Sequence, residues 1–576
     1  MILVFAIRRC AETLRFGAWI AVTASATLLA SLSVAAASPP SPGAIENALR
    51  DVEAFYSRLD HQMTVPEKER TNETEEVVDK PAVQQPSASQ TEQPAEAGAA
   101  DRFWVSNIDI SESQVLSRSR LSGMAEPLKQ RVVGLDELNR LVEQINALYR
   151  ERNFVTARAI LPQQEVVDGV VRIQLIEARI DQVEVIDNLH TREKYITRRL
   201  GLAEGAFADV NALEDALLAF NAVNDVQLRA LLQPGSRPHT TSYVLQAAEP
   251  EKHHLSVLVD NAGRETIGEE RVGLTYTNNS LTGYRDRLSA GMSHADGTNA
   301  GYLVYGRPLN RFGTQATLGI DYSQIVVVSG ELAAFGVEGQ STVASAFLSH
   351  PVRVTLQGSL HGLVGVNVKD SETDFDGIDR FESAVRTFSV GAEYQRSGNG
   401  YMLYARPRLN FGVKGLGGDS SFTTLSADAG VVITAAPSHQ FAFRLRGQLS
   451  DEQILPSSEQ FQMGGAASVR GFPEGLLIGD QGYFLSTEYR YLGFSASAEG
   501  AQAWHPLLFA DHGGVFTSAA DRSLDGSTYL TSVGMGFSYR FSDKLTANFQ
   551  VGFPLSDRPE FEDDYAVHFH INFMPF

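Results

Sequence analysis

Two pairs of side chains have the residue types that chemistry would need. His568 and His570 stand two apart on a strand-like segment and could bind a metal ion, and Asp511-His512 could supply two members of a hydrolytic triad. The histidines have no further ligand nearby in the sequence, and no G-x-S-x-G segment offers a nucleophilic serine. The sequence therefore predicts no catalytic residue, no metal site and no cofactor.

The composition favours a large β structure. The chain has 576 residues, too many for one compact core, and they include 49 Gly, 18 Tyr and 31 Phe. A formal net charge of −21 argues against a nucleic-acid partner, which would need basic surface to neutralise phosphates. Cys10 is the only cysteine and lies in the segment that we expect to be removed, so disulfides and thiolate sites are not expected.

Residues 1–37 are typical of a secretory signal peptide. Three arginines, at positions 8, 9 and 15, accompany an apolar run that ends in an A-x-A cleavage site at Ala35–Ala37. The alternative is an uncleaved anchoring helix, which the small residues in the second half of the run disfavour. No later run is apolar over the roughly 18 residues of a helical span, so a membrane location would require a closed barrel.

A helix and a linker are expected next. Residues 38–63 carry apolar side chains at helical spacing, among them Ile45, Leu49, Phe55 and Leu59. Residues 64–101 are rich in Glu, Gln, Pro and Ser and cannot bury a core, which predicts a disordered linker. A helix on such a tether can dock and leave again.

Residues 102–178 and 179–250 each follow the order strand, helix, strand, strand. In the first unit a helix is expected over 135–150, with strands over 104–110, 155–160 and 170–176 and a turn at Asp168-Gly169. In the second unit Asn211 and Glu214 predict a capping box at the start of the helix, and strands are expected over 180–186, 226–232 and 242–245. The similar order is a weak internal repeat.

Residues 251–576 alternate with a period of two and show no convincing helix. In the last segment Val567, Phe569, Ile571 and Phe573 alternate with His568, His570 and Asn572. Four turn dipeptides separate such runs: Asp296-Gly297, Asp376-Gly377, Asn399-Gly400 and Asp525-Gly526. At roughly 20 residues for a strand with its loop, this segment accommodates about 16 antiparallel strands.

A soluble β-sandwich also alternates, but two further features distinguish the runs of this sequence. One face of the runs carries charged and small polar residues, and Glu488 and Arg490 are interpreted as charges in a watery lumen. The opposite face is apolar, with Tyr489, Tyr491 and Tyr539 near the ends of runs, as in an interfacial girdle. Both features favour a transmembrane barrel over a sandwich.

Two motifs connect the sequence with a known group of proteins. Val469-Arg470-Gly471-Phe472, preceded by Gly464-Gly465, resembles the signature of outer-membrane barrels that carry POTRA domains, and Phe509, Asp511 and Gly513 resemble its companion strand motif. The first α+β unit is similar to the first POTRA domain of two-partner secretion transporters, the haemolysin-activator and filamentous-haemagglutinin transporter family. The positions that match are Tyr149, Arg152, Ala157, Leu161-Pro162, Asp168-Gly169 and Glu177.

The resemblance implies an all-β transmembrane barrel of 16 strands in the outer membrane of a Gram-negative bacterium, preceded by two small periplasmic α+β POTRA domains. Such domains are expected to take up an unfolded secreted polypeptide, of adhesin or haemolysin type, by adding its strand to their own sheet. The polypeptide would then cross the barrel and fold outside. Outer-membrane lipid and the barrel-assembly machinery are the other expected partners.

The resemblance also assigns roles to single residues. A motif loop inside the lumen would bring Arg470 into a confined space where it needs a carboxylate, and Asp511 is the matching candidate; the alternative is an exposed loop. The helix in 38–63 resembles a pore plug; the alternative is docking on a POTRA surface. Phe576 resembles the C-terminal address that the assembly machinery reads; the alternative is an ordinary apolar end.

The sequence departs from the family pattern in two places, and other functions stay open. The linker 64–101 is long and acidic, and Asp187-Asn188 stands where the family often has a glycine. The alternative functions are an assembly or insertion factor of the same superfamily, a passive porin or receptor, and an outer-membrane enzyme. A gene for a large adhesin or haemolysin beside this one would discriminate best.

Overall fold

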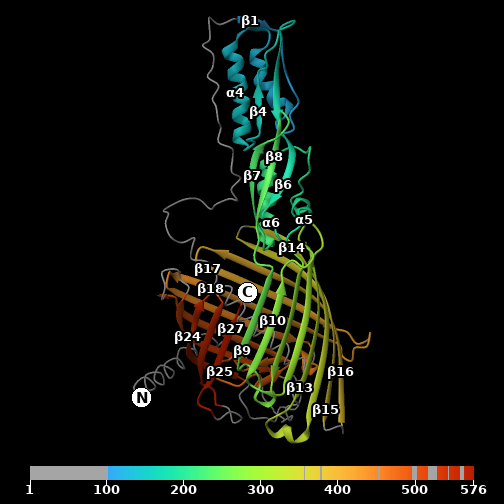
Figure 1. Ribbon diagram of the computed structural model, residues 1–576, viewed down its shortest axis with the longest axis vertical. Coiled ribbons are helices and arrows are strands. Elements are labelled where there is room, and N and C mark those ends of the chain that lie inside the picture. Colours follow the sequence, from blue (N-terminus) through green and yellow to red (C-terminus); the bar gives the residue numbers. More distant parts are fainter. Residues whose placement is uncertain are drawn as a thin grey trace.

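The computed structural model describes residues 102–355, 357–375, 379–451, 454–495, 502–516, 529–542, 544–557 and 563–575. Two small α+β domains form a column that stands on a closed β-barrel (Figure 1). The expected signal peptide, the helix in 38–63, the linker 64–101 and Phe576 lie outside the described residues, as do the expected turns at Asp376-Gly377 and Asp525-Gly526.

The first domain has two helices rather than the predicted one. Its elements are β1 (Arg102–Val105), β2 (Asn107–Ile110), α3 (Arg118–Ala125), β3 (Arg131–Gly134), α4 (Leu135–Glu151), β4 (Ala157–Ile160) and β5 (Val170–Glu177). The single strand predicted over 104–110 is wrong, because the chain changes partner at Ser106: β1 pairs with β3 and β2 pairs in parallel with β5. Helix α3 escaped prediction because eight polar-rich residues carry too little periodicity.

The second domain repeats the plan of a three-stranded sheet with helices on it. Its elements are β6 (Arg179–Ile186), α5 (Glu193–Leu200), α6 (Val210–Val223), β7 (Gln227–Pro234) and β8 (Thr240–Ala248), and the sheet order is β6-β8-β7. The predicted capping box is wrong. Asp209 is the N-cap and accepts from the Ala212 N–H at 3.1 Å, because Asn211 already lies in the first turn and donates to the Arg152 carbonyl at 2.9 Å.

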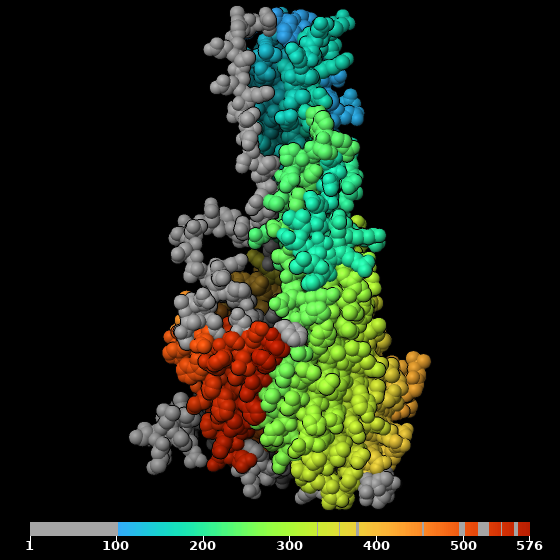
Figure 2. Space-filling view, in the orientation of Figure 1, coloured from blue at the N-terminus to red at the C-terminus, as the bar shows by residue number. Residues whose placement is uncertain are grey.

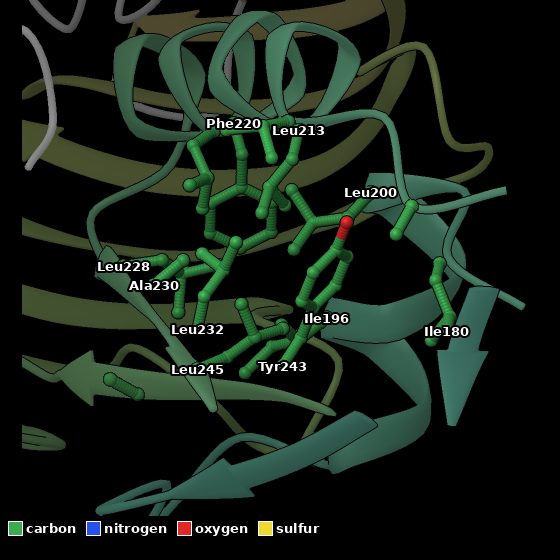
Figure 3. Close-up of a cluster of buried hydrophobic side chains, with 14 of the residues drawn as sticks. Ile180, Ile196, Leu200, Leu213, Phe220, Leu228, Ala230, Leu232, Tyr243 and Leu245 are labelled. Atoms are coloured by element: carbon green, nitrogen blue, oxygen red, sulfur yellow. The ribbon is translucent and has the colours of Figure 1, made fainter. Parts of the chain in front are cut away.

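Helices α5 and α6 close the second domain over one face of its sheet. Leu213 and Phe220 of α6 point toward Leu228 and Leu245 of the sheet, as Figure 3 shows. The same cluster contains Ile196, Leu200 and Tyr243, all buried. The edge strands β6 and β7 also contribute apolar side chains to this core, among them Ile180 and Leu228.

The departure at Asp187 has a local explanation. Asp187 has a φ of 63°, the left-handed conformation that a glycine would adopt most easily, and aspartate is among the side chains that tolerate it. Its Oδ2 accepts a hydrogen bond from Gln246 Nε2 at 2.9 Å. The aspartate therefore keeps the backbone turn and adds a hydrogen bond to β8.

Sixteen antiparallel strands close the barrel within the described ranges, which confirms the predicted strand number. They are β9 (His253–Asp260), β10 (Arg271–Asn278), β11 (Arg287–Ala295), β12 (Thr298–Pro308), β13 (Gln315–Val326), β14 (Val337–Thr355), β15 (Gly358–Phe375), β16 (Asp379–Gly398), β17 (Tyr401–Gly412), β18 (Phe422–Ala436), β19 (His439–Ser450), β22 (Gln481–Tyr491), β24 (Ala503–Phe516), β25 (Tyr529–Ser542), β26 (Leu545–Pro554) and β27 (Ala566–Phe573). A two-residue strand, β23 (Phe494–Ser495), pairs only with β24.

The alternation in the sequence becomes the two faces of the wall. On β27, His568 and His570 are buried in the interior, whereas Ile571 and Phe573 are exposed on the outside. An apolar outer surface and a polar interior are what a barrel in lipid requires. None of the helices in the described part of the chain is long and apolar enough to cross a membrane.

Strand pairing is uneven around the barrel. Strand β15 pairs with β16 along its whole length, Gly358–Phe375. The closing pair is much shorter, because β27 meets β9 only over His570–Phe573.

The column of small domains rises above the N-terminal strands of the barrel, coloured green in Figure 2.

Candidate functional site

The loop between β19 and β22 folds back inside the barrel. Within it β20 (Phe461–Met463) pairs with β21 (Leu477–Gly479) as a short antiparallel ribbon, and residues 464–476 form its tip. Val469 and Phe472 of the tip are fully buried against Phe484 of β22 and Leu530 of β25, which belong to the inner face of the wall. We call residues 454–480 the lumen loop. The apolar members of the motif thus anchor the lumen loop by packing.

Arg470 and Asp511, the pair predicted from the sequence, are in direct contact. Arg470 Nε donates to Asp511 Oδ2 at 2.7 Å and Nη2 donates to Oδ1 at 2.9 Å, which makes a two-pronged pair. The backbone N–H of Arg470 also donates to Asp511 Oδ2, at 3.1 Å. Arg470 is 3% exposed and Asp511 1%, so an exposed position for Arg470 is excluded.

A second carboxylate shares Arg470, and the sequence did not reveal this role. Nη1 donates to Glu488 Oε2 at 2.7 Å and to Gln550 Oε1 at 3.2 Å. Arg490 Nε donates to the other oxygen of Glu488 at 2.5 Å. Alternation had placed Glu488 and Arg490 in the lumen, but only the folded loop shows that one guanidinium connects β22, β24 and β26.

Phe509, the first residue of the companion motif, supports the same guanidinium. Its ring centroid lies 3.6 Å from the Arg470 guanidinium carbon, so the cation faces the negative surface of the ring. Ser486 adds a hydroxyl that donates to Asp511 Oδ1 at 2.6 Å. The motif residues of β24 therefore surround the motif arginine of the lumen loop.

Two motif glycines are required by close approach. Gly471 has a φ of 136°, and a Cβ there would lie 2.9 Å from Ser532 Cβ and 3.3 Å from the backbone of Gly552. A Cβ at Gly513 would overlap Met463 of the lumen loop. Any side chain at either position would push the lumen loop away from the wall.

Family models match most of the described chain. The model for the haemolysin secretion/activation protein ShlB/FhaC/HecB matches residues 240–539, and the ShlB-type POTRA domain matches residues 103–178.

The chain belongs to the ShlB/FhaC/HecB family.

Named relatives and a solved structure agree with this assignment. The heme/hemopexin transporter protein HuxB of Haemophilus influenzae (strain 86-028NP) is 23% identical over 79% of this chain and 85% of its own length. The outer membrane transporter CdiB of Dickeya dadantii (strain 3937) is 22% identical over 80% of this chain and 84% of its own length. The structure of CdiB from Escherichia coli superposes with a TM-score of 0.65 at 18% identity, covering 94% of this chain and all of that one.

As a member of this family the chain is an outer-membrane transporter of two-partner secretion, and its POTRA domain lies in the periplasm. This placement orients the barrel. The turns on the side of the small domains face the periplasm, and the lumen loop enters from the cell exterior. The barrel and transport functions inferred from the motifs are thereby confirmed.

Three of the residues that signalled the first POTRA domain, Tyr149, Arg152 and Glu177, contact the segment before its first helix. Tyr149 Oη donates to Glu177 Oε1 at 2.9 Å, and Glu177 Oε2 accepts from the Gln114 N–H at 2.8 Å. Arg152 Nη1 donates to the Val115 carbonyl at 2.8 Å. Their joint task is to fix the segment that precedes α3.

The tip of the lumen loop also lies beside the connection between β9 and β10. Glu474 Oε1 accepts from the Ala466 N–H at 2.6 Å, which closes the tip on itself. Glu474 lines a small cavity of about 40 Å³ together with Arg264, Arg271 and Arg446. Burial raises the pKa of Glu474 to about 7, although Arg271 and Arg264 oppose the rise.

A larger cavity of about 680 Å³ lies beside the tip, between it and the wall from β16 to β22. Its lining includes Tyr404, Arg406, Arg444, Arg490 and the loop residues Ser468 and Arg470. Two of these arginines have carboxylate partners on neighbouring strands: Arg406 with Glu393 at 2.6 Å and Arg444 with Asp428 at 3.2 Å. The lumen beside the loop is thus open, and charged side chains lie among the apolar ones that line it.

The histidines that raised the idea of a metal site face the interior of the barrel. His570 Nδ1 lies 4.0 Å from Asp260 Oδ2, and His568 is buried beside it on β27. Within the described ranges no group of three His, Cys, Asp or Glu side chains is arranged to hold a metal ion. His512 instead accepts or donates a hydrogen bond with Tyr483 Oη at 3.0 Å.

Proposed function

We propose that the chain exports one dedicated secreted protein, of adhesin or haemolysin type, which it binds unfolded in the periplasm and passes through its barrel. The observation that carries the proposal is the lumen loop. A loop that is anchored inside the lumen by a buried arginine and by its apolar tip, beside an open cavity of about 680 Å³ with arginines in its lining, fits a pore that passes a polypeptide. A passive porin would have no need of two domains in front of it.

The small domains offer edges to an extended polypeptide. In the first domain β2 and β4 flank β5, and in the second β6 and β7 flank β8. An edge strand presents unpaired N–H and C=O groups, and an added strand satisfies them without requiring one particular sequence. This supports the proposal that residues 102–178 and 179–250 act as two POTRA domains that receive unfolded cargo.

Several assignments outside the described residues belong to the same proposal. Residues 1–37 direct export and are removed, and the helix in 38–63, with Ile45, Leu49, Phe55 and Leu59 on its apolar face, plugs the resting pore on the tether 64–101. Phe576 is the address for the barrel-assembly machinery, and the barrel 251–576 sits in outer-membrane lipid. Deletion of residues 44–63 is expected to raise the ion conductance of the reconstituted barrel; unchanged conductance contradicts plugging.

The proposal assigns the chain no catalytic step, no cofactor and no nucleic-acid partner. Transport by such a chain needs a source of free energy other than nucleotide hydrolysis. In our proposal, folding of the cargo at the cell surface supplies this free energy. The net charge of −21 is consistent with a protein that handles polypeptide rather than nucleic acid.

Deletion of the gene tests the proposal directly. We expect the growth medium of the deletion strain to lack one large protein while the amounts of other outer-membrane barrels stay unchanged. Mass spectrometry of medium and membranes measures both. A general fall in outer-membrane barrels would instead indicate an assembly factor, and an unchanged medium would contradict export.

A further inference from the structure

The first periplasmic turn of the barrel, residues 279–286 between β10 and β11, reaches into the second domain. Ser280 Oγ donates to the His190 carbonyl at 2.7 Å. In return, the Arg192 N–H donates to the Gly283 carbonyl at 2.9 Å. These bonds join the turn to the segment that leads into α5.

Tyr284 at the tip of this turn is held from both sides. Its ring packs against the core of the second domain and meets the Tyr195 ring edge-on, with 6.4 Å between centroids. The Arg192 guanidinium lies 5.0 Å from the Tyr284 ring centroid, and that of Arg307, on β12, lies 5.2 Å from it. One aromatic ring therefore contacts cations from the domain and from the barrel.

Arg285 forms the ionic part of the contact. Its side chain is 2% exposed, and its Nε donates to Asp225 Oδ1 at 2.9 Å while Nη2 pairs with Oδ2. Asp225 follows α6 of the second domain. Arg285 has a φ of 55°, a left-handed conformation that side chains disfavour, so the turn keeps this shape only with support from its surroundings.

The barrel wall stiffens the turn from below. Asp286 Oδ1 accepts from the Thr282 N–H at 2.9 Å, and its Oδ2 accepts from Tyr305 Oη at 2.9 Å. In sequence the domain and the barrel are joined by residues 249–252, between the end of β8 and the start of β9, and α6 also lies beside β14 of the barrel. Four residues limit the separation of two bodies but do not fix their relative rotation.

We propose that residues 280–285 are a docking element that holds the second domain in one orientation on the barrel, so that a polypeptide strand on the domain's sheet edge is presented to the lumen. The inference rests on the proposed export function. Tyr284 and Arg285 are positioning residues, because they contact the domain and act on the cargo only through it.

The physical reason is effective concentration. A strand bound to a freely rotating domain would face the pore for only part of the time, whereas a fixed domain keeps it at the entrance. Loss of the docking element should therefore lower the rate of export without weakening the first binding of cargo to the domains.

The test uses the full chain in a Cys10→Ser background, which removes the only native cysteine. Spin labels on cysteines at Glu204 of the second domain and Ala435 of the barrel report their distance in the reconstituted protein. Tyr284→Ala and Asp225→Ala should broaden that distance distribution.

In cells the same variants should lower export about five- to tenfold, measured as the amount in the medium of the protein that the gene deletion removes. Arg285→Lys keeps the positive charge but cannot donate two hydrogen bonds to Asp225 in the same geometry. Its distance distribution and its export should therefore lie between those of wild type and Tyr284→Ala.

Arg311→Ala is the matched control. Arg311 is exposed on the next periplasmic turn and lies over Phe312 of that same turn, so its loss should change neither the distance nor export. A broadened distance with export within twofold of wild type would overturn the presentation role. An unchanged distance would overturn the docking element itself. If the gene deletion removes no protein from the medium, the export function fails while the distance measurement still decides the docking element.

Discussion

Two arginine–aspartate pairs of similar geometry stand at different places in the molecule, one in the lumen and one at the periplasmic rim. Arg470 and Asp511 in the lumen have side chains that are 4% and 0% exposed, whereas Arg285 and Asp225 at the periplasmic rim are 2% and 44% exposed. Both guanidinium groups make two-pronged contacts. The difference lies in the acid, which is sealed from solvent in the lumen and reaches solvent at the rim.

This difference in burial predicts different responses to mutation. A fully buried pair leaves an uncompensated charge when either partner is removed, at a cost of about 3–5 kcal/mol. A pair with one solvated partner loses much less when the buried member is the one removed. The lumen pair is thus costly to break from either side, whereas the cost of breaking the rim pair depends on which partner is removed.

The largest expected effect is that of Asp511→Ala. Arg470 would lose both prongs and the acceptor of its backbone N–H, and only Glu488 would balance its charge. We expect the lumen loop to lose about 3–5 kcal/mol of anchoring and export to fall by a factor on the order of 100. Export is measured by immunoblot of the medium. Wild-type export in both Asp511→Ala and Arg470→Ala would show that the pair is not needed.

The charge-swapped double variant, Arg470→Asp with Asp511→Arg, should not recover export. An aspartate at 470 would remove the guanidinium that now donates to Glu488 Oε2 at 2.7 Å and would add a second carboxylate to the same buried site, where two carboxylates disfavour each other. The same assay compares the swap with each single variant. Recovery to more than a tenth of wild-type export would mean that Glu488 contributes little.

At the rim the two single variants should differ from each other. Asp225→Ala leaves the Arg285 guanidinium buried without its partner and should cost about 2–3 kcal/mol, whereas Arg285→Ala leaves a solvated carboxylate and should cost about 1 kcal/mol. Hydrogen exchange of peptides that cover 279–286 and 190–200 measures both. Equal losses would mean that Asp225 is sealed from solvent.

The smallest expected effect is that of Glu393→Gln. This carboxylate pairs with Arg406 on the lumen wall at 2.6 Å, but the two side chains are 43% and 26% exposed. Solvent screening limits such a pair to about 0–1 kcal/mol, so export should stay within twofold of wild type. A loss as large as that of Asp511→Ala would show that any lumen charge matters, and the contrast with Arg470 would fail.

The sequence by itself determined the architecture and one half of the site. Period-two alternation predicts the barrel because every spanning strand must turn one face to lipid and the other to the lumen. This requirement acts within each strand and does not depend on how the strands pair. The helical spacing of apolar residues likewise predicted helix α4 of the first domain. The motif resemblance brought Arg470 and Asp511 together, although 41 positions separate them in the sequence.

Only the tertiary structure shows which other side chains contact the Arg470–Asp511 pair. Glu488 and Gln550 join Arg470 because β22, β24 and β26 face one point in the lumen, and strand register across a closed barrel is a long-range property that no single segment encodes. The division of residues 102–110 between two sheet partners has the same origin. The sequence does not single out Tyr284 or Arg285, because their contacts arise only when the second domain packs on the turn that they occupy.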